Sequence, residues 1–414
     1  MTEIFEKCKK AKEAALKLGN ISTQIKNKAL DAMADALGKN SKDIILANKI
    51  DLQEGEKKGL SSALLDRLMI NEKRILGIID ALDVVKKLKD PIGEIISEWT
   101  RPNGLRIQKK RVPLGVVGII YEARPNVTVD SASLCMKSGN STVLRGGSDA
   151  INSNKILAKI ISEAAYGAGI PEGAIELISD TSRESAEELM GMRGYLDVLI
   201  PRGGKNLIQT VVQKAKVPTI ETGEGNCHAY VEKTADLKMA VDIVYNAKVS
   251  RPSVCNAIET LLIDEAIADK FLPVIFAKLQ EAGVEIRGDK KVKAIDSSVK
   301  DAVEEDWATE FLSLILTVKV VKDYKEAVAH INKYGTRHSE MIVTKDKQAE
   351  NYFLAYVDAS SVYVNASTRF TDGGEFGFGA EIGVSTQKLH ARGPMGLPEL
   401  TSYKYVVYGD GQVR

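Results

Sequence analysis

The chain has 414 residues, of which 44% are hydrophobic and 27% charged, and its 57 Lys and Arg residues nearly balance 56 Asp and Glu residues. This length predicts two or three domains. The near-zero net charge argues against a nucleic-acid binder, and the hydrophobic content argues against a disordered chain.

The first ~90 residues are predicted to be helical, because apolar side chains recur there at three- and four-residue steps, as at Ile25, Ala29 and Met33. The N-terminal segment lacks the apolar core of a signal peptide. The chain also contains no uncharged apolar run long enough for a membrane span. We therefore expect a cytoplasmic protein that does not contact membranes.

A β-hairpin is predicted next. Two extended runs, 95–99 and 105–112, flank the segment Arg101-Pro102-Asn103-Gly104. Asn-Gly between two extended runs is the preferred pair for a type I′ turn. The second run carries four basic residues. Such a ribbon is either solvated or packed on a partner subunit.

From residue 114 onward, short apolar strands alternate with helical segments. The expected strands and helices are 114–121, 130–137, 142–145, 152–166, 174–178, 182–190, 196–200 and 205–215. This order predicts a parallel sheet covered by helices, with ligands at the carboxyl ends of its strands.

A second α/β domain is predicted after Glu221. Its expected elements are 236–249, 257–263, 266–279, 314–321, 324–332, 340–344, 347–356 and 361–364. The segment from residue 365 is rich in glycine and ends in an extended run, 403–408. Long loops of this kind in a compact protein are usually functional or disordered.

Cys255 is the candidate nucleophile among four cysteines, none of which forms a C-x-x-C pair. It lies between an expected helix and an expected strand, and Arg251 is close enough in sequence to favour its thiolate. The alternative is a buried cysteine that packs as a small hydrophobic residue. No histidine is marked as its base, and no metal site is expected.

Neither a P-loop nor a G-x-G-x-x-G fingerprint is present. Two long segments are more specific. Residues 112–130 read VPLGVVGIIYEARPNVTVD, and residues 377–397 read GFGAEIGVSTQKLHARGPMGL. Together they resemble, along essentially the whole chain, the γ-glutamyl phosphate reductase (glutamate-5-semialdehyde dehydrogenase) family of the aldehyde dehydrogenase superfamily.

The resemblance implies an aldehyde-dehydrogenase-like α/β fold, with two parallel-sheet α/β domains and a β-flap for oligomerisation. It assigns 1–228 to an NADP-binding domain whose hairpin 94–112 contributes to the flap. Residues 229–364 would form the catalytic domain that contains Cys255. Residues 365–414 would form the Gly-rich segment and the oligomerisation strand.

The resemblance also implies residue roles. Cys255 matches the catalytic cysteine, and Asn126 matches the asparagine that stabilises the oxyanion. Arg145 beside Ser148 would hold a 2′-phosphate and so favour NADPH, whereas the segment after Glu310 departs from the superfamily pattern. The cofactor-binding residues implied are Arg145, Gly146, Gly147, Ser148, Gly203, Gly204, Glu221 and Glu310.

The implied reaction is the NADPH-dependent reduction of L-glutamyl 5-phosphate to L-glutamate 5-semialdehyde and phosphate, through a cysteine thioester, in proline biosynthesis. Such an anionic substrate needs cations. The candidates are Arg124, Arg251, Arg369, His390 and Arg392. The resemblance also implies a homodimer or dimer of dimers, and functional coupling to glutamate 5-kinase.

Three alternative functions remain open. The first is an aldehyde dehydrogenase that oxidises another semialdehyde, with water activated by Glu221. The second is a cysteine acyltransferase that uses no cofactor and needs a histidine near Cys255. The third is a scaffold in which Cys255 is buried and unreactive.

Overall fold

The computed structural model describes residues 1–122 and 124–414. These residues form two compact units. Unit 1 comprises Met1–Thr222, Gly377–Gly383 and Met395–Arg414, and unit 2 comprises Gly223–Phe376 and Val384–Pro394. The C-terminal segment therefore contributes to both units. Within the described residues, no helix is long and apolar enough to cross a membrane.

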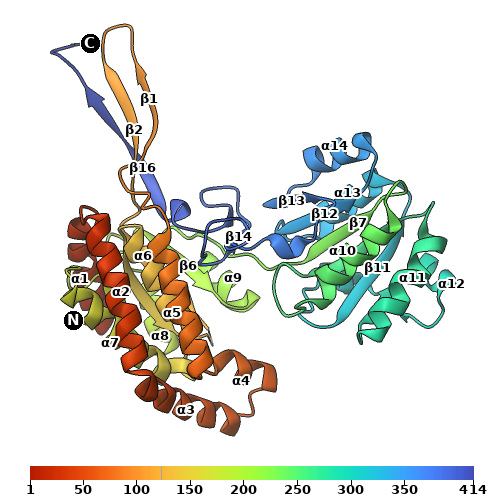
Figure 1. Ribbon diagram of the computed structural model, residues 1–414, viewed down its shortest axis with the longest axis horizontal. Coiled ribbons are helices and arrows are strands. Elements are labelled where there is room, and N and C mark those ends of the chain that lie inside the picture. The colour runs from red at the N-terminus through yellow and green to blue at the C-terminus, as the bar shows by residue number, and fades with distance from the viewer. Residues whose placement is uncertain (123) are drawn as a thin grey trace. The chain divides into compact units, whose positions relative to one another are not determined.

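Unit 1 is built around a four-stranded parallel sheet with the order β5-β4-β3-β6. Its strands are β3 (Val116–Tyr121), β4 (Ser141–Gly146), β5 (Ile175–Leu177) and β6 (Val198–Arg202). Its helices are α1 (Glu3–Leu18), α2 (Thr23–Lys39), α3 (Ser41–Lys57), α4 (Ser62–Leu68), α5 (Glu72–Lys87), α6 (Asn126–Lys137), α7 (Ile151–Gly167), α8 (Arg183–Met190) and α9 (Lys205–Lys214) (Figure 1). The helical N-terminus and the alternation of strands and helices are confirmed.

The helix expected at 130–137 is longer than predicted, because α6 begins at Asn126. Pro125 precedes it with φ −58° and ψ −31°, which are already helical angles. The proline ring fixes φ near this value, so Pro125 is suited to a helix start. The extra turn places Asn126 at the N-terminus of the helix.

The predicted hairpin is confirmed, and it forms a three-stranded antiparallel arm. Strand β2 (Arg106–Pro113) pairs on one side with β1 (Ile95–Thr100) and on the other with β16 (Thr401–Tyr408) (Figure 1). The arm therefore joins two segments that are far apart in the sequence.

The turn type predicted for this hairpin is wrong. Of the pair Asn103–Gly104, only Gly104 has a positive φ, of 88°, whereas a type I′ turn needs two such residues. Gly104 N instead donates to Arg101 O at 2.9 Å. Pro102 follows Arg101, and proline favours this second position of a type I turn.

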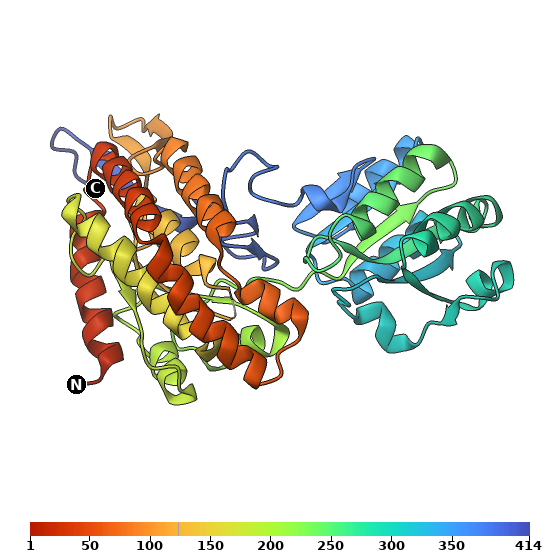
Figure 2. The ribbon, with the colours of Figure 1, turned by 60° about the horizontal axis from the view of Figure 1, so that its bottom comes forward.

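Unit 2 contains a seven-stranded parallel sheet with the order β10-β9-β11-β8-β7-β12-β13. Its strands are β7 (Cys227–Val231), β8 (Ile258–Asp264), β9 (Glu285–Gly288), β10 (Lys300–Asp301), β11 (Ile315–Val321), β12 (Ser339–Val343) and β13 (Ser361–Val364). Its helices are α10 (Leu237–Val249), α11 (Ala268–Glu281), α12 (Lys290–Ile295), α13 (Tyr324–Tyr334) and α14 (Lys347–Tyr356). Helices cover both faces of the sheet (Figure 2).

Every strand and helix predicted for this second domain is present, but β7, β9, β10 and α12 were not predicted. Strand β7 is completely buried. Ala229 packs into the core under α10 and α11, and its neighbour Tyr230 packs into the core under α13 and α14. A strand buried on both faces shows no alternation of apolar and polar residues.

A buried ion pair joins α10 to β8. Lys248 Nζ lies 2.5 Å from Glu259 Oε2, and neither side chain is exposed. Lys248 also donates to Ile258 O at 3.0 Å, and Glu259 Oε1 accepts from Leu312 N at 3.1 Å. Burial raises the pKa of Glu259 and lowers the pKa of Lys248, while the charge of each partner opposes the shift of the other.

Removing one member of this pair should destabilise the protein. Lys248→Met would leave a buried carboxylate without its cation, so we expect the free energy of unfolding to fall by about 3 kcal/mol. Urea unfolding measures this free energy. The double variant Lys248→Met/Glu259→Met should recover most of the loss. Lys278→Met, which breaks an exposed pair with Asp242 at 2.9 Å, is the control, and an equal loss there would contradict the argument.

Candidate active site

Cys255 lies in the loop between α10 and β8, and it is half-buried. The loop ends where β8 begins, and β7 and β12 begin at the same edge, since Cys227 pairs with Ile258 and His228 with Glu340. The amino ends of three neighbouring parallel strands therefore surround the candidate nucleophile.

The segment before β7 packs directly against the backbone of Cys255. A Cβ on Gly225 would lie 1.5 Å from the Cys255 carbonyl oxygen, so only glycine fits there. Cys227 Sγ donates to the same oxygen at 3.1 Å. Burial raises the pKa of the Cys227 thiol well above its usual value, which keeps its proton in place as the donor. Gly225 N donates to Oε1 of Glu310 at 2.8 Å.

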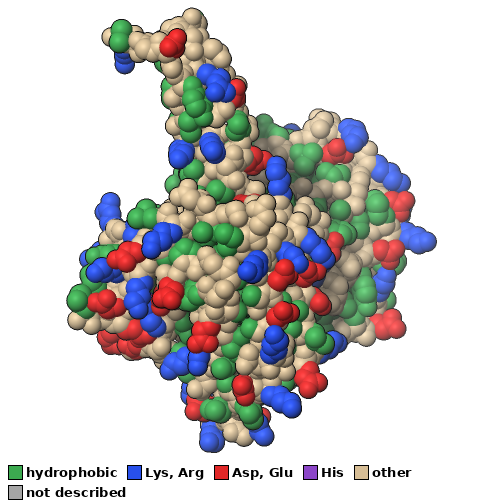
Figure 3. Space-filling view, turned by 60° about the vertical axis from the view of Figure 1, so that its left-hand side comes forward, with side chains coloured by type: hydrophobic (Ala, Val, Ile, Leu, Met, Phe, Trp, Pro, Cys, Tyr) green, Lys and Arg blue, Asp and Glu red, His purple; other side chains and the backbone are tan. Residues whose placement is uncertain are grey.

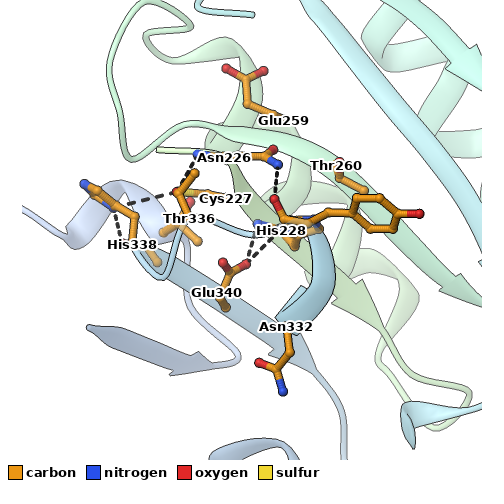
Figure 4. Close-up of polar contacts among 12 residues, drawn as sticks. Asn226, Cys227, His228, Glu259, Thr260, Asn332, Thr336, His338 and Glu340 are labelled. Carbon is orange, nitrogen blue, oxygen red and sulfur yellow. Dashed lines mark hydrogen bonds and ion pairs between the residues drawn. The ribbon is translucent and has the colours of Figure 1, made fainter. Parts of the chain in front are cut away.

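Asn226 also holds the segment before β7 in place through hydrogen bonds. Its Nδ2 donates to the carbonyl oxygens of Trp307, at 2.8 Å, and Tyr334, at 2.9 Å. Its backbone N donates to Thr336 Oγ1 at 3.0 Å, and that hydroxyl donates to Glu224 O at 2.6 Å. Figure 4 shows Asn226, Cys227 and Thr336 side by side. The backbone next to Cys255 is thus held by bonds from several elements.

Two of the predicted substrate cations come together at the Cys255 loop. Arg369, in the short helix Thr368–Phe370, donates to Asn256 Oδ1 and, at 3.1 Å, to Ser250 Oγ. Burial lowers the pKa of Arg369, and the charge of Arg251 lowers it further, whereas a negative charge on Cys255 would raise it. The effect of the Arg251 charge on Arg369 places both arginines within electrostatic range of one loop, where two cations would favour the thiolate.

For the other predicted substrate residues, the structure gives contacts away from the Cys255 loop or within the other unit alone. Arg392 Nη2 donates to Asp358 Oδ1 at 2.8 Å. His390 is exposed, and its carbonyl oxygen accepts from Gln387 Nε2 at 3.0 Å. Arg124 belongs to unit 1, where its carbonyl oxygen accepts from Val127 N at 3.0 Å. Their predicted roles stay predictions.

Most of the predicted cofactor residues of unit 1 lie at or just after the carboxyl ends of β4 and β6. Arg145 Nη2 donates to the carbonyl oxygens of Thr181 and Ser182, both at 2.7 Å. A Cβ on Gly146 would lie 2.1 Å from Asn154 Nδ2, so this strand end also requires glycine. Gly147 and Ser148 then lead into α7 through the short helix Ser148–Ala150.

The N-terminus of α9 already attracts an anion. Gly204 N donates to Glu122 Oε2 at 2.9 Å, and a Cβ on Gly203 would lie 2.4 Å from the same oxygen. A helix N-terminus with close backbone suits a phosphate as well as a carboxylate. Glu221 follows α9 and is half-buried.

Asn126 is oriented by a residue of its own helix. Its Nδ2 donates to Asp130 Oδ2 at 2.8 Å. Burial raises the pKa of Asp130 to about 6, and the Asn126 bond and the charge of Arg202 oppose that shift. An amide nitrogen carries two N–H donors, so the bond to Asp130 uses one of them.

Sequence reasoning missed several residues that shape these sites. Nothing in the local sequence around Cys227 indicates its contact with Cys255. The missed residues are Glu122, Asp130, Gly225, Asn226, Cys227, Asn256 and Thr336. Over residues 1–122 and 124–414, no group of three His, Cys, Asp or Glu side chains could hold a metal ion.

Comparison with known proteins gives consistent matches. Residues 2–305 match the model of the aldehyde dehydrogenase family. The γ-glutamyl phosphate reductase of Heliobacterium modesticaldum is 60% identical over 413 residues, covering 100% of this chain and 99% of the relative. That of Halothermothrix orenii is 57% identical over 412 residues, with the same coverage. The crystal structure of γ-glutamyl phosphate reductase from Thermotoga maritima matches with a TM-score of 0.98 and 52% identity, covering 100% of both chains.

The contact between Gly225 and Cys255 can be tested by adding one methyl group. Gly225→Ala would push the Cys255 loop away, and we expect the free energy of unfolding to fall by about 1–3 kcal/mol. Iodoacetamide should alkylate Cys255 more slowly at pH 7, because the loop would move from Arg369. The control is Gly77→Ala in α5, where a Cβ meets nothing within 4 Å. Unchanged stability and alkylation in Gly225→Ala would disprove the contact.

Proposed function

Because the chain belongs to the aldehyde dehydrogenase family and, within it, to the γ-glutamyl phosphate reductases, we propose that it reduces L-glutamyl 5-phosphate to L-glutamate 5-semialdehyde and phosphate. The observation that carries the proposal is the full-length match at 57–60% identity to reductases of that name. The cluster of Cys255, Arg251 and Arg369 supports it, because the reaction needs a nucleophile beside cations.

The reaction proceeds through a thioester on Cys255. The thiolate attacks the acyl carbon, and the resulting tetrahedral oxyanion collapses with loss of phosphate, so a C–S bond replaces a C–O bond. NADPH, when bound, supplies the hydride that reduces the thioester carbon. The second oxyanion then expels the Cys255 thiolate and releases the aldehyde. No step needs an activated water, so Glu221 is not assigned as a base.

We assign oxyanion stabilisation to Asn126. Its bond to Asp130 fixes the plane of the amide, and the second N–H remains for the developing charge. Preorganised donors of this kind stabilise a transition state more than a ground state.

The family uses a nicotinamide cofactor, and we propose NADPH. The residues of unit 1 fit a phosphate-bearing ligand, since α9 offers its N-terminus to a carboxylate and Gly146 leaves no room for a side chain. Arg145 and Ser148 would hold the 2′-phosphate. Gly147, Gly203, Gly204, Glu221 and Glu310 complete the proposed cofactor set.

We also propose that the arm mediates a homodimer or a dimer of dimers. Trp99, Tyr405, Val407 and Tyr408 are between 39% and 55% exposed on it. Figure 3 shows hydrophobic and basic side chains together along the projecting ribbon. Such exposed apolar groups usually mark an interface.

The proposal extends to the cellular setting of the enzyme. Coupling to glutamate 5-kinase would supply the labile acyl phosphate. Four cysteines that form no disulfide bond support a cytoplasmic location.

Cys255→Ala tests the nucleophile. We expect reduction of L-glutamyl 5-phosphate to fall at least about 10⁴-fold, because thioester formation is lost. NADPH binding, followed by fluorescence titration, should stay within about twofold of wild type. Cys135→Ala, which removes a buried thiol of unit 1, is the matched control. Substantial reduction by a folded Cys255→Ala protein would rule out the assigned nucleophile.

A phosphate-dependence assay separates the proposal from oxidation of a semialdehyde with water as acceptor. Run in reverse, glutamate 5-semialdehyde and NADP⁺ should give NADPH only when inorganic phosphate is added, because phosphate must resolve the thioester. NADPH formation at the same rate without phosphate would favour the hydrolytic alternative, with Glu221 as the base.

A further inference from the structure

Glu310 binds the residue that packs directly against Cys255. Its Oε1 accepts from Gly225 N at 2.8 Å. A Cβ on Gly225 would lie 1.5 Å from Cys255 O and 2.6 Å from Cys255 Cα. Gly225 is therefore in contact both with the Glu310 carboxylate and with the backbone of Cys255, and all three residues belong to unit 2. A hydrogen bond from a backbone N–H to a carboxylate is roughly twice as strong as a neutral one.

The residue after Gly225 is bound to the same stretch of chain. Asn226 Nδ2 donates to Trp307 O at 2.8 Å. Trp307 lies in the short helix Glu304–Ala308, and Glu310 follows that helix closely. Two consecutive residues before β7 are thus held by the segment 307–310. Because Asn226 keeps its own bonds, loss of the Glu310 bond should displace Gly225 without unfolding the segment.

The backbone just after Glu310 is strained and held in place. Leu312 has a φ of 53°, which is unfavourable for a bulky side chain. Leu312 N donates to Glu259 Oε1 at 3.1 Å, and Glu259 is paired with Lys248 at 2.5 Å. The pair flanks the Cys255 loop, so the segment that carries Glu310 is tied to the same loop. Strained backbone persists only where its surroundings fix it, and it is frequent at functional sites.

The charge of Glu310 works against a thiolate nearby. Burial raises the pKa of the Cys227 thiol most, and nearby negative charges, including that of Glu310, raise it further. Cys227 Sγ lies 3.1 Å from Cys255 O. A like charge disfavours the ionised form of a neighbouring group, so the carboxylate would also raise the pKa of Cys255. Any benefit of Glu310 to the nucleophile must therefore come from position.

We propose that Glu310 is a positioning residue for Cys255, acting through Gly225. The bond from Gly225 N keeps this backbone against the Cys255 loop. Through that contact the loop stays near Arg251 and Arg369, where the two cations favour the thiolate. The inference rests on the proposed function only in taking Cys255 as the nucleophile. It adds to the cofactor contact proposed for Glu310, since the same side chain would then join the cofactor site to the nucleophile.

The pH profile of Cys255 alkylation in the protein without cofactor tests this role. Iodoacetamide reacts with the thiolate, and mass spectrometry of the Cys255 peptide gives the rate. Glu310→Ala removes the acceptor, so the loop should move away from the cations. We expect the midpoint of the profile to rise by about one pH unit and the rate at pH 7 to fall about fivefold. A thermal unfolding curve shows that the variant is folded, and a change in stability alone would not move the midpoint.

Glu310→Gln separates position from charge. The amide oxygen can still accept from Gly225 N, whereas the negative charge is gone. We expect a midpoint at or below that of wild type. A rise equal to that in Glu310→Ala would overturn the proposal, and so would a fall of the midpoint in both variants, because the charge alone would then act. Unchanged profiles in both variants would overturn it too.

Glu310→Asp provides a second variant in case Glu310→Ala does not fold. It keeps the charge, but its side chain is one methylene shorter and does not reach Gly225 N. The midpoint should rise as expected for Glu310→Ala, and a wild-type profile would overturn the proposal. The matched control is Glu305→Ala, because Glu305 is exposed in the short helix before Glu310. An equal rise in the control would refute the assigned contact.

Failure of this proposal and failure of the proposed reduction are distinguishable. The alkylation profiles need neither NADPH nor acyl phosphate, so profiles that refute the role of Glu310 leave the Cys255→Ala result unchanged. Substantial reduction by Cys255→Ala would reject the nucleophile without altering the alkylation profiles.

Discussion

The position of Cys255, the proposed nucleophile, depends on a residue without a side chain. Gly225 brings the backbone before β7 so near to Cys255 that a single methyl group would lie 1.5 Å from the Cys255 carbonyl oxygen. Close packing of this kind transmits small displacements, because interiors have few voids to absorb them. The thiol of Cys227, bonded to the same oxygen at 3.1 Å, adds a directional contact to the steric one. The position of the loop therefore depends both on the absence of a side chain at Gly225 and on the hydrogen bonds that neighbouring residues donate.

Two different kinds of interaction hold the same loop. The Lys248–Glu259 pair joins the helix before the loop to the strand after it, and it is stabilising only while both members are present, because each alone is a buried charge. Within the loop, Asn256 accepts from Arg369 and donates to Thr371 O at 3.0 Å. These hydrogen bonds of the neutral amide orient the loop. A rigid loop flanked by cations lets the thiolate form with little reorganisation.

Much of the fold could be predicted, because it follows from patterns within short stretches of the sequence. Apolar periodicity located the helices, and alternation of strands and helices identified the parallel sheets. Strand β7 was not predicted, because its five consecutive residues are all buried and show no alternation of apolar and polar side chains. The turn type predicted for the hairpin was wrong, because Pro102 and not the Asn103–Gly104 pair determines the geometry of the turn. At the site, Cys255, Arg251 and Arg369 stand in recognisable motifs, whereas Gly225, Asn226 and Thr336 matter only through contacts between distant segments.

The near-zero net charge of the chain has a consequence for how the protein binds anions. A protein of net charge +1 has no global field to attract anions, so anionic groups must be held locally. The structure does this in two ways. In unit 1 the N-terminus of α9 binds Glu122 through backbone, at 2.9 Å from Gly204 N. In unit 2 Ser250 and Asn256 hold the guanidinium of Arg369 at the Cys255 loop, and the charge of Arg251 lowers the pKa of Arg369. An anion at this loop would offset the repulsion between the two cations, so the proposed thiolate and a substrate phosphate would both be favoured there.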